Sequence, residues 1–100
     1  MHNEEIIKAI QSTNKLNKTQ AKVLEILYKT SINGESDVTH TFLSSKCKNV
    51  SKQYISKILK ALKEKKFIQF DKDFKNQVFI LNTESLELLL KSYELKSNID

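Results

Sequence analysis

The chain of 100 residues contains no arginine, no proline and no tryptophan, and it has one glycine and one cysteine. A single cysteine cannot form an internal disulfide, and no second cysteine or histidine cluster accompanies Cys47 to complete a zinc site. The single glycine excludes the glycine-rich loops that hold phosphates in nucleotide-binding enzymes. No nucleophile is accompanied by a base and an orienting residue, so the sequence predicts neither an enzyme nor a cofactor.

Long apolar runs are also missing. The longest leucine run covers residues 88–90, far below the roughly 18 residues that a membrane-spanning helix needs. The first residues, MHNEEIIKAI, are acidic at the front and lack a small-residue cleavage site, which argues against a signal peptide. With the lone cysteine, this predicts a cytoplasmic protein. The composition, 39% hydrophobic and 29% charged, predicts one folded domain over residues 1–100.

All seventeen basic residues are lysine, and the net charge of +5 is unevenly distributed. Residues 1–40 hold five lysines and five acidic residues, residues 41–80 hold ten and three, and residues 81–100 hold two and four. This segregation indicates a cationic surface for nucleic acid, whereas lysines that only solvate helix surfaces explain the lysine count but not the segregation. Without arginine, the bases would be contacted by Lys, Gln, Asn and Ser.

Apolar periodicity and capping residues predict five helices: over residues 1–15, from Asn17 to the turn at 33–34, from Thr39 to the turn at 48–50, over Ser51–Lys66, and over 83–98. Asn17 and Gln20 have the spacing of a capping box, in which each side chain accepts the other residue's backbone N–H. Two apolar runs, FIQF and QVFIL, flank a polar loop and predict a β-hairpin. The fold class is therefore mainly α with a small β-hairpin, an α+β arrangement.

The helix predicted over residues 51–66 follows a polar turn, Lys48-Asn49-Val50, as in a helix-turn-helix motif. At 100° per residue, its isoleucines and leucines lie on one side and its lysines largely on the other. Side chains in the first turns of such a helix contact base edges in the major groove, and later ones contact phosphates. The base-contacting candidates are Lys52, Gln53, Ser56 and Lys57, and Lys60 is a phosphate candidate. A solvated amphipathic helix is the alternative for such a face.

The last helix carries apolar residues on two sides. One stripe starts at Leu86, and a second stripe, with Leu88 and Leu95, points away from it. Because a small domain buries only one face of a helix, the second stripe predicts a dimer contact, shared with Ile6 and Ile10 of the first helix. Fraying, or coiling back onto the same domain, is the alternative.

The run FLSSKCKNVSKQYISKILKALKEKKFI resembles the winged-helix superfamily, over about residues 17–90 with a core at 17–82. Similar proteins are small bacterial regulators of the MarR and ArsR types and plasmid-partition adaptors of the TubR type. The resemblance implies a homodimer whose second motif helix enters a major groove while the hairpin, or wing, contacts the flanking backbone. It implies DNA-backbone contacts at Thr41, Ser44, Ser51, Tyr54, Lys72, Lys75 and Asn76. Many members have glycine after the second helix, where this chain has Lys66, and the cysteines of metal sensors are absent.

The leading hypothesis is a dimeric, sequence-specific protein for double-stranded DNA that acts as a transcriptional repressor. A second hypothesis is an adaptor that coats centromere-like repeats of a plasmid or phage and engages a segregation motor protein. A third is a winged helix used only for protein–protein contacts. Salt-dependent, sequence-selective DNA binding separates the first two from the third, and occupancy of one palindrome rather than an array separates the first from the second.

Overall fold

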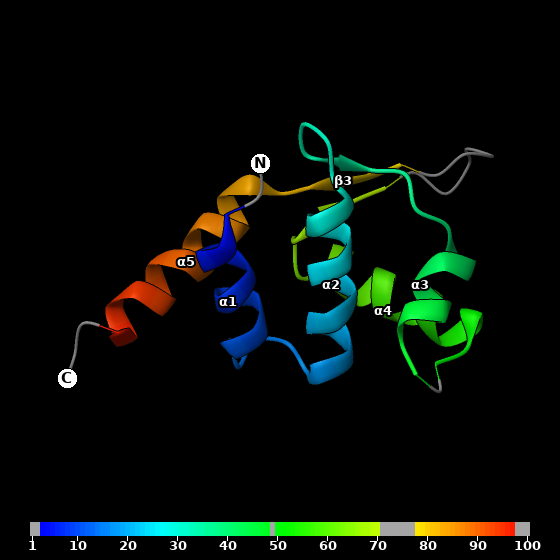
Figure 1. Ribbon diagram of the computed structural model, residues 1–100, viewed down its shortest axis with the longest axis horizontal. Coiled ribbons are helices and arrows are strands. Elements are labelled where there is room, and N and C mark those ends of the chain that lie inside the picture. The colour runs from blue at the N-terminus through cyan, green and yellow to red at the C-terminus, as the bar shows by residue number, and fades with distance from the viewer. Residues whose placement is uncertain (1–2, 49, 71–77, 98–100) are drawn as a thin grey trace.

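The computed structural model describes residues 3–48, 50–70 and 78–97 (Figure 1). The elements in chain order are α1 (Glu4–Ser12), α2 (Lys18–Thr30), β1 (Glu35–Ser36), α3 (His40–Lys46), α4 (Lys52–Glu64), β2 (Ile68–Gln69), β3 (Phe79–Leu81) and α5 (Thr83–Ser97). The chain is mainly helical with one small antiparallel sheet, which agrees with the predicted α+β class.

A polar side chain caps the start of each of the first four helices. The caps are Asn3, Asn17, Thr39 and Ser51. At α2, Asn17 Oδ1 accepts the Gln20 N–H at 2.8 Å, and Gln20 Oε1 accepts the Asn17 N–H at 3.2 Å, which confirms the capping box. Such side chains satisfy N–H groups that lack partners inside the helix, so local sequence sets where these helices begin.

The sheet has the strand order β1-β3-β2, with both pairs antiparallel. Ile68 lies opposite Leu81, which confirms the hairpin predicted from FIQF and QVFIL. Ser36 lies opposite Phe79 and adds a third strand that the sequence analysis did not predict. This strand spans two residues directly after the turn at 33–34, so it is too short to carry an alternating apolar pattern.

The core is formed where α2 and α4 pack on each other and on the sheet, with α1 and α5 extending it. Leu24 and Leu27 of α2, Leu59 and Leu62 of α4, and Phe79 of β3 are fully or almost fully buried. The molecule is elongated, 47 × 29 × 24 Å, and Figure 1 places α1 and α5 at one end and α3 at the other. The exposed surfaces of α3 and α5 therefore lie far apart.

α4 ends two residues before the predicted Lys66 because a hydrogen-bonded motif closes it. The Phe67 N–H donates to the Leu62 carbonyl and the Lys66 N–H donates to the Lys63 carbonyl, both at 3.0 Å. This pair of bonds is the Schellman motif, whose closing residue adopts a left-handed conformation and is usually glycine. Lys66 has φ 68° and occupies that position. It is the position at which the resemblance leads one to expect glycine.

The structure corrects the predicted dimer role of Ile10. This side chain is 0% exposed, and it lies in the chain's own core beside Ala9. Ile6 is half-buried and packs against the same core. The reason is that α2 and α5 both pack on α1, so the apolar stripe of α1 is covered by helices of the same chain. The sequence pattern identified an apolar stripe but not which helix covers it.

Candidate nucleic-acid interface

The rotation of α4 about its axis is fixed by four buried side chains. These are Ile55, Ile58, Leu59 and Leu62. They lie on one face of the helix, as the sequence periodicity predicted, and they pack against α2, α3 and β2. Because this face is in the core, the opposite face of α4 points to solvent.

The exposed face of α4 brings together the base-contacting candidates predicted from sequence. Lys52, Gln53, Ser56, Lys57 and Lys60 are all exposed. Within residues 3–48, 50–70 and 78–97, none of these five side chains has a hydrogen bond or an ion pair. Their donors and acceptors are therefore available to a partner that lies along the helix.

Three exposed hydroxyl groups at the starts of α3 and α4 remain candidates for phosphate contacts. Ser51 Oγ accepts the Tyr54 N–H at 3.1 Å, which leaves its own O–H free to donate. The Tyr54 side chain is 45% exposed, and Thr41 is exposed in the first turn of α3. Hydroxyl groups beside a basic helix commonly donate to DNA phosphates.

The structure corrects the expected place of Ser44, whose phosphate contact was predicted for a hydroxyl group at a helix start. Ser44 lies in the last turn of α3, not at a helix start, and it is half-buried. Its Oγ donates to the Val50 carbonyl at 2.6 Å, so its proton is used within the chain. This hydrogen bond joins α3 to the turn before α4. Ser44 therefore helps to set the angle between the two helices.

The predicted hairpin-loop candidates Lys72, Lys75 and Asn76 lie outside the described residues. The chain next to that loop is attached firmly to α4. Lys63 Nζ donates to the Phe70 carbonyl at 3.0 Å and lies 4.7 Å from the centroid of the Phe70 ring. Lys63 therefore stabilises the packing of α4 on the hairpin rather than serving as a free cation.

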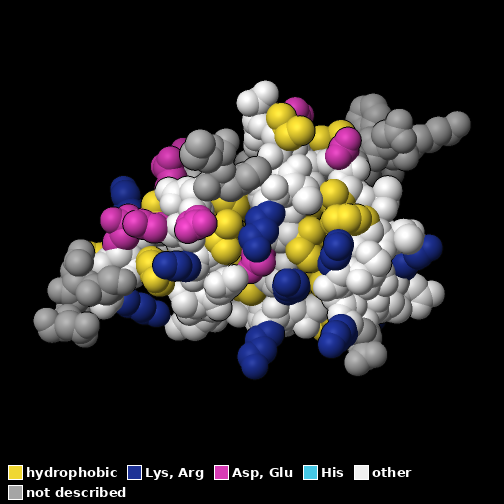
Figure 2. Space-filling view, in the orientation of Figure 1, with side chains coloured by type: hydrophobic (Ala, Val, Ile, Leu, Met, Phe, Trp, Pro, Cys, Tyr) yellow, Lys and Arg dark blue, Asp and Glu magenta, His cyan; other side chains and the backbone are white. Residues whose placement is uncertain are grey.

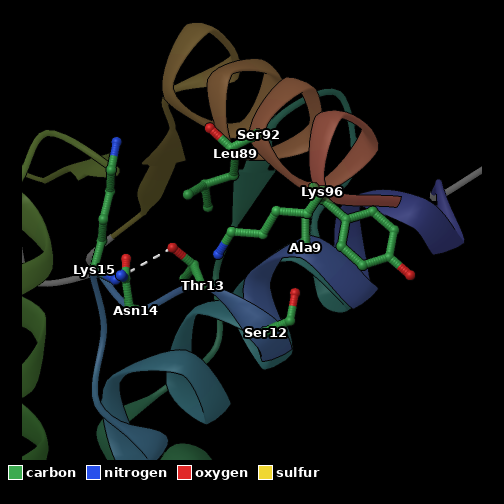
Figure 3. Close-up of a pocket in the computed structure, with 9 residues that line it drawn as sticks. Ala9, Ser12, Thr13, Asn14, Lys15, Leu89, Ser92 and Lys96 are labelled. Carbon is green, nitrogen blue, oxygen red and sulfur yellow. Dashed lines mark hydrogen bonds between the residues drawn. The ribbon is translucent and has the colours of Figure 1, made fainter. Parts of the chain in front are cut away.

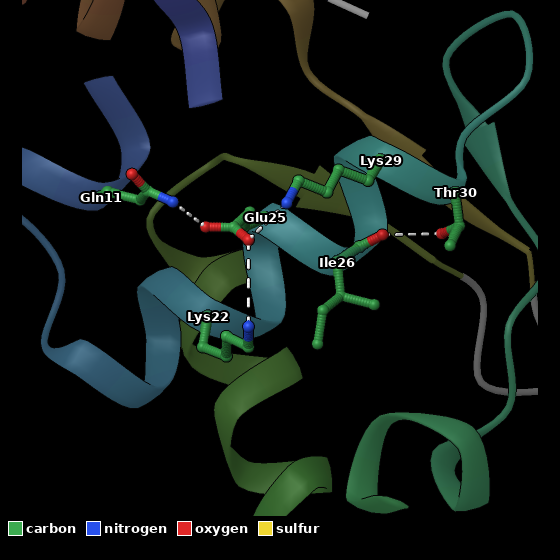
Figure 4. Close-up of polar contacts among 6 residues, drawn as sticks. All are labelled: Gln11, Lys22, Glu25, Ile26, Lys29 and Thr30. Carbon is green, nitrogen blue, oxygen red and sulfur yellow. Dashed lines mark hydrogen bonds and ion pairs between the residues drawn. The ribbon is translucent and has the colours of Figure 1, made fainter. Parts of the chain in front are cut away.

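In the described part of the chain, both ion pairs use Glu25 (Figure 4). Its carboxylate lies 3.0 Å from Lys29 Nζ and 4.0 Å from Lys22 Nζ, and it accepts a hydrogen bond from Gln11 Nε2 at 2.6 Å. Burial alone raises the pKa of Glu25, but the hydrogen bonds from Gln11 and Lys29 and the charges of Lys29 and Lys22 together lower it. The network keeps Glu25 ionised and joins α1 to α2, and it neutralises no lysine of α4.

One further hollow lies between α5 and the connection from α1 to α2 (Figure 3). It has a volume of about 180 Å³ and is lined by polar side chains such as Thr13 and Lys96 and by apolar ones such as Leu89. Thr13 Oγ1 accepts the Lys15 N–H at 3.2 Å and so stabilises this connection. Pockets for small organic ligands have volumes of about 300–1,000 Å³, so this hollow is small for an effector site.

The structure also brings together four lysines that the sequence analysis did not group. Lys18 and Lys22 of α2, Lys46 at the end of α3 and Lys48 of the turn line a cleft of about 370 Å³. Figure 2 shows lysine side chains mostly over the lower half of the view and acidic ones mostly over the upper half. Lys46 and Lys48 bracket Cys47 in the sequence, but no local pattern links them to α2, and only the packing of the helices does so.

No protein-family model matches the chain, and neither a curated protein nor a solved structure matches it. Among the described residues, no three His, Cys, Asp or Glu side chains are grouped so that they could hold a metal ion. The same residues include no helix with the length and apolar character needed to cross a bilayer. The surface chemistry around α4 is therefore the main indication of function in the described residues.

Proposed function

We propose that this chain is a winged-helix protein that binds double-stranded DNA sequence-specifically as a homodimer and regulates transcription, with α4 as the recognition helix. One observation carries the proposal. The outward face of α4 holds Lys52, Gln53, Ser56 and Lys57 in its first turns, all exposed and without partners among the described residues. A soluble helix needs a polar outer face, but such a face normally mixes charges, and the first turns here contain no acidic residue.

The order of the elements supports the winged-helix assignment. From α2 onward the chain runs helix, strand, helix, helix, strand, strand, and β1 joins the hairpin at its β3 edge. α3 and α4 are connected by a short turn, and the Ser44–Val50 hydrogen bond ties the end of α3 to that turn. A helix-turn-helix needs this rigid connection, because the first helix positions the second in the groove.

The chemistry of the exposed α4 face suits a duplex. A side-chain amide such as that of Gln53 pairs with two atoms of adenine, and an ammonium group such as that of Lys57 donates to guanine O6 and N7. Lys60, one turn further along the helix, is positioned to contact phosphate, and the Ser51 and Tyr54 hydroxyls border the same face. Phosphate contacts supply affinity, and base contacts supply selectivity.

The dimer part of the proposal is supported by α5. Leu88 and Leu95 are 58% and 64% exposed, and they are spaced seven residues apart, which places them on one side of the helix. Leu86 and Leu89, on another side, are buried in the core. A second copy that covers Leu88 and Leu95 would bury the apolar surface and pair two recognition helices for two half-sites of DNA.

Selection from a pool of randomised duplexes, followed by fluorescence anisotropy on the enriched duplex, tests the proposal. We expect one enriched motif with two-fold symmetry. A dimer with about six to ten lysine–phosphate contacts should lose roughly 10³–10⁵ in affinity between 50 and 200 mM salt. Equal binding to all duplexes would contradict sequence-specific recognition, and binding without salt dependence would contradict DNA contact through the lysine face. Occupancy of a long array instead of a single motif would favour partition over repression.

A further inference from the structure

The cleft lined by Lys18, Lys22, Lys46 and Lys48 is separate from the exposed face of α4. Its walls come from the first two turns of α2, the end of α3 and the turn that follows, and the remaining lining residues are Thr19, Cys47 and Val50. At about 370 Å³ it falls in the size range of small-ligand sites, about 300–1,000 Å³. The four-lysine cleft therefore has room for a small anionic group.

The charges around the four-lysine cleft are one-sided. None of its lining residues is acidic. Lys22 is 4.0 Å from the Glu25 carboxylate, and the Lys46 amine lies over the Phe42 ring, 5.4 Å from its centroid. In the described part of the chain, Lys18 and Lys48 have no acidic partner and donate no side-chain hydrogen bond. Lys18, Lys46 and Lys48 have no carboxylate partner among the described residues, and like charges in one cleft repel one another unless an anion lies between them.

The backbone of α2 adds to this positive field. α2 has 13 residues, and its first N–H groups, at Lys18 and Thr19, have no acceptor within the helix. Only the third, at Gln20, is bound by the Asn17 cap. The helix dipole places a partial positive charge at this end, where phosphate groups are favoured.

Cys47 connects the two walls of the four-lysine cleft electrostatically. Burial raises the pKa of its thiol, and the positive charge of Lys22 opposes that rise. The ammonium group of an α2 residue thus acts on the sulfur at the end of α3. The two walls therefore share one electrostatic environment, although the residues are 25 positions apart in the sequence.

We infer that the four-lysine cleft is a binding site for linked phosphate groups, distinct from the base-contacting face of α4. Two sources supply this chemistry: a free oligophosphate, or the backbone of a nucleic acid that passes the start of α4. Lys18 and Lys48, which have no acidic partners, make the main contacts, and the N-terminal end of α2 adds N–H donors.

The first arm of the test uses the protein without DNA. Sodium tripolyphosphate is titrated into the ¹⁵N-labelled full chain, and the amide shifts of Lys18, Thr19 and Cys47 are followed. The double variant Lys18→Gln/Lys48→Gln should bind at least about tenfold more weakly, because hydrogen bonds to charged groups are among the strongest. The matched control is Lys8→Gln/Lys96→Gln, which removes two exposed lysines of α1 and α5 and should bind as the wild type does.

The second arm measures the salt dependence of duplex binding with the same variants. If the DNA backbone occupies the four-lysine cleft, Lys18→Gln/Lys48→Gln should reduce the slope of log K against log salt by about 2, with unchanged base preference. An effect in the first arm alone assigns the cleft to free oligophosphates.

Equal weakening by both variants, or no effect of Lys18→Gln/Lys48→Gln in either arm, overturns the inference. If the wild type binds no duplex, the proposed DNA function fails and the first arm alone decides on the cleft. A thermal unfolding curve of each variant, measured by circular dichroism, confirms that the fold is retained.

Discussion

α4 and α5 are similar in length and both bury leucines in the same core, but their outer faces differ. The outer face of α4 holds lysines and short polar side chains, with no acidic residue before Glu64. The outer face of α5 holds Leu88 and Leu95 together with acidic residues. The first surface attracts a polyanion, and the second loses free energy in water unless it is covered. One small domain thus presents one cationic outer surface and one partly apolar outer surface.

The outer faces of α4 and α5 lie in different parts of the molecule, so a partner on one does not block the other. α3, which packs on α4, lies at one end of a 47 Å molecule, and α5 packs on α1 at the other end. A second copy bound to the outer face of α5 would leave the outer face of α4 uncovered. Substitutions on one face should therefore leave the binding properties of the other face unchanged.

The largest expected effect is on the free energy of unfolding, where a buried leucine of α4 and an exposed leucine of α5 should differ. Leu62→Ala should lower the free energy of unfolding by about 2–5 kcal/mol, because Leu62 is fully buried in α4. Leu95→Ala should change it by less than about 0.5 kcal/mol in dilute protein, because Leu95 lies at the surface. Urea unfolding followed by circular dichroism measures both. Similar losses for the two variants would mean that Leu95 already packs within one chain.

The next effect concerns the outer face of α4. Gln53→Ala and Lys57→Ala should each cost about 1–3 kcal/mol of binding to the preferred duplex and relax the base preference at one position. Both side chains are exposed, so the free energy of unfolding should stay within about 0.5 kcal/mol of the wild type. Anisotropy with matched and mismatched duplexes checks this, with Lys8→Ala on α1 as control. Uniform weakening on every duplex would assign these residues to phosphate instead.

The outer face of α5 gives the third prediction. Leu88→Glu/Leu95→Glu should raise the dissociation constant of the dimer at least about tenfold, because each buried leucine contributes about 1.5–3 kcal/mol. Sedimentation equilibrium measures the constant. Ile32→Glu is the control, since Ile32 is 76% exposed and lies before β1, outside α5. A wild-type chain that sediments as a monomer at high concentration would rule out the proposed dimer.

The smallest effect is a gain in stability at the end of α4. Lys66→Gly should raise the free energy of unfolding by about 1 kcal/mol, because a side chain in the left-handed conformation costs about 1–2 kcal/mol and glycine is freer in the unfolded chain. Lys66→Ala removes the same charge but keeps the backbone cost, so it should give no gain. The urea midpoint of each variant decides between them. Equal gains would point to charge repulsion among neighbouring lysines.

Features encoded by neighbouring residues were predictable from the sequence. Asn17, Thr39 and Ser51 cap the predicted helices, because a capping side chain accepts a backbone N–H only three positions along the chain. The buried stripe of α4 and the hairpin follow from periodicity in the same way. The exposed face of α4 was predictable for the same reason, since the two faces of one helix determine each other.

Features that depend on the packing of distant segments were not predictable. Ile10 belongs to an apolar stripe that is buried once α2 and α5 pack on α1, and nothing near residue 10 indicates this packing. The hydrogen bond of Ser44 was not predictable either, because it depends on where the Val50 carbonyl lies after the turn. The four-lysine cleft joins residues about 30 positions apart, so it exists only in the folded chain.

The single cysteine gives the chain an internal reporter of motion. Cys47 is 6% exposed at the junction of α3 and the turn, and its burial raises the pKa of the thiol. A thiol reagent therefore reacts slowly while this junction is closed and faster whenever it opens. The alkylation rate of Cys47 therefore reports how often the junction between α3 and α4 opens. The rate can be measured with and without duplex on the unlabelled protein.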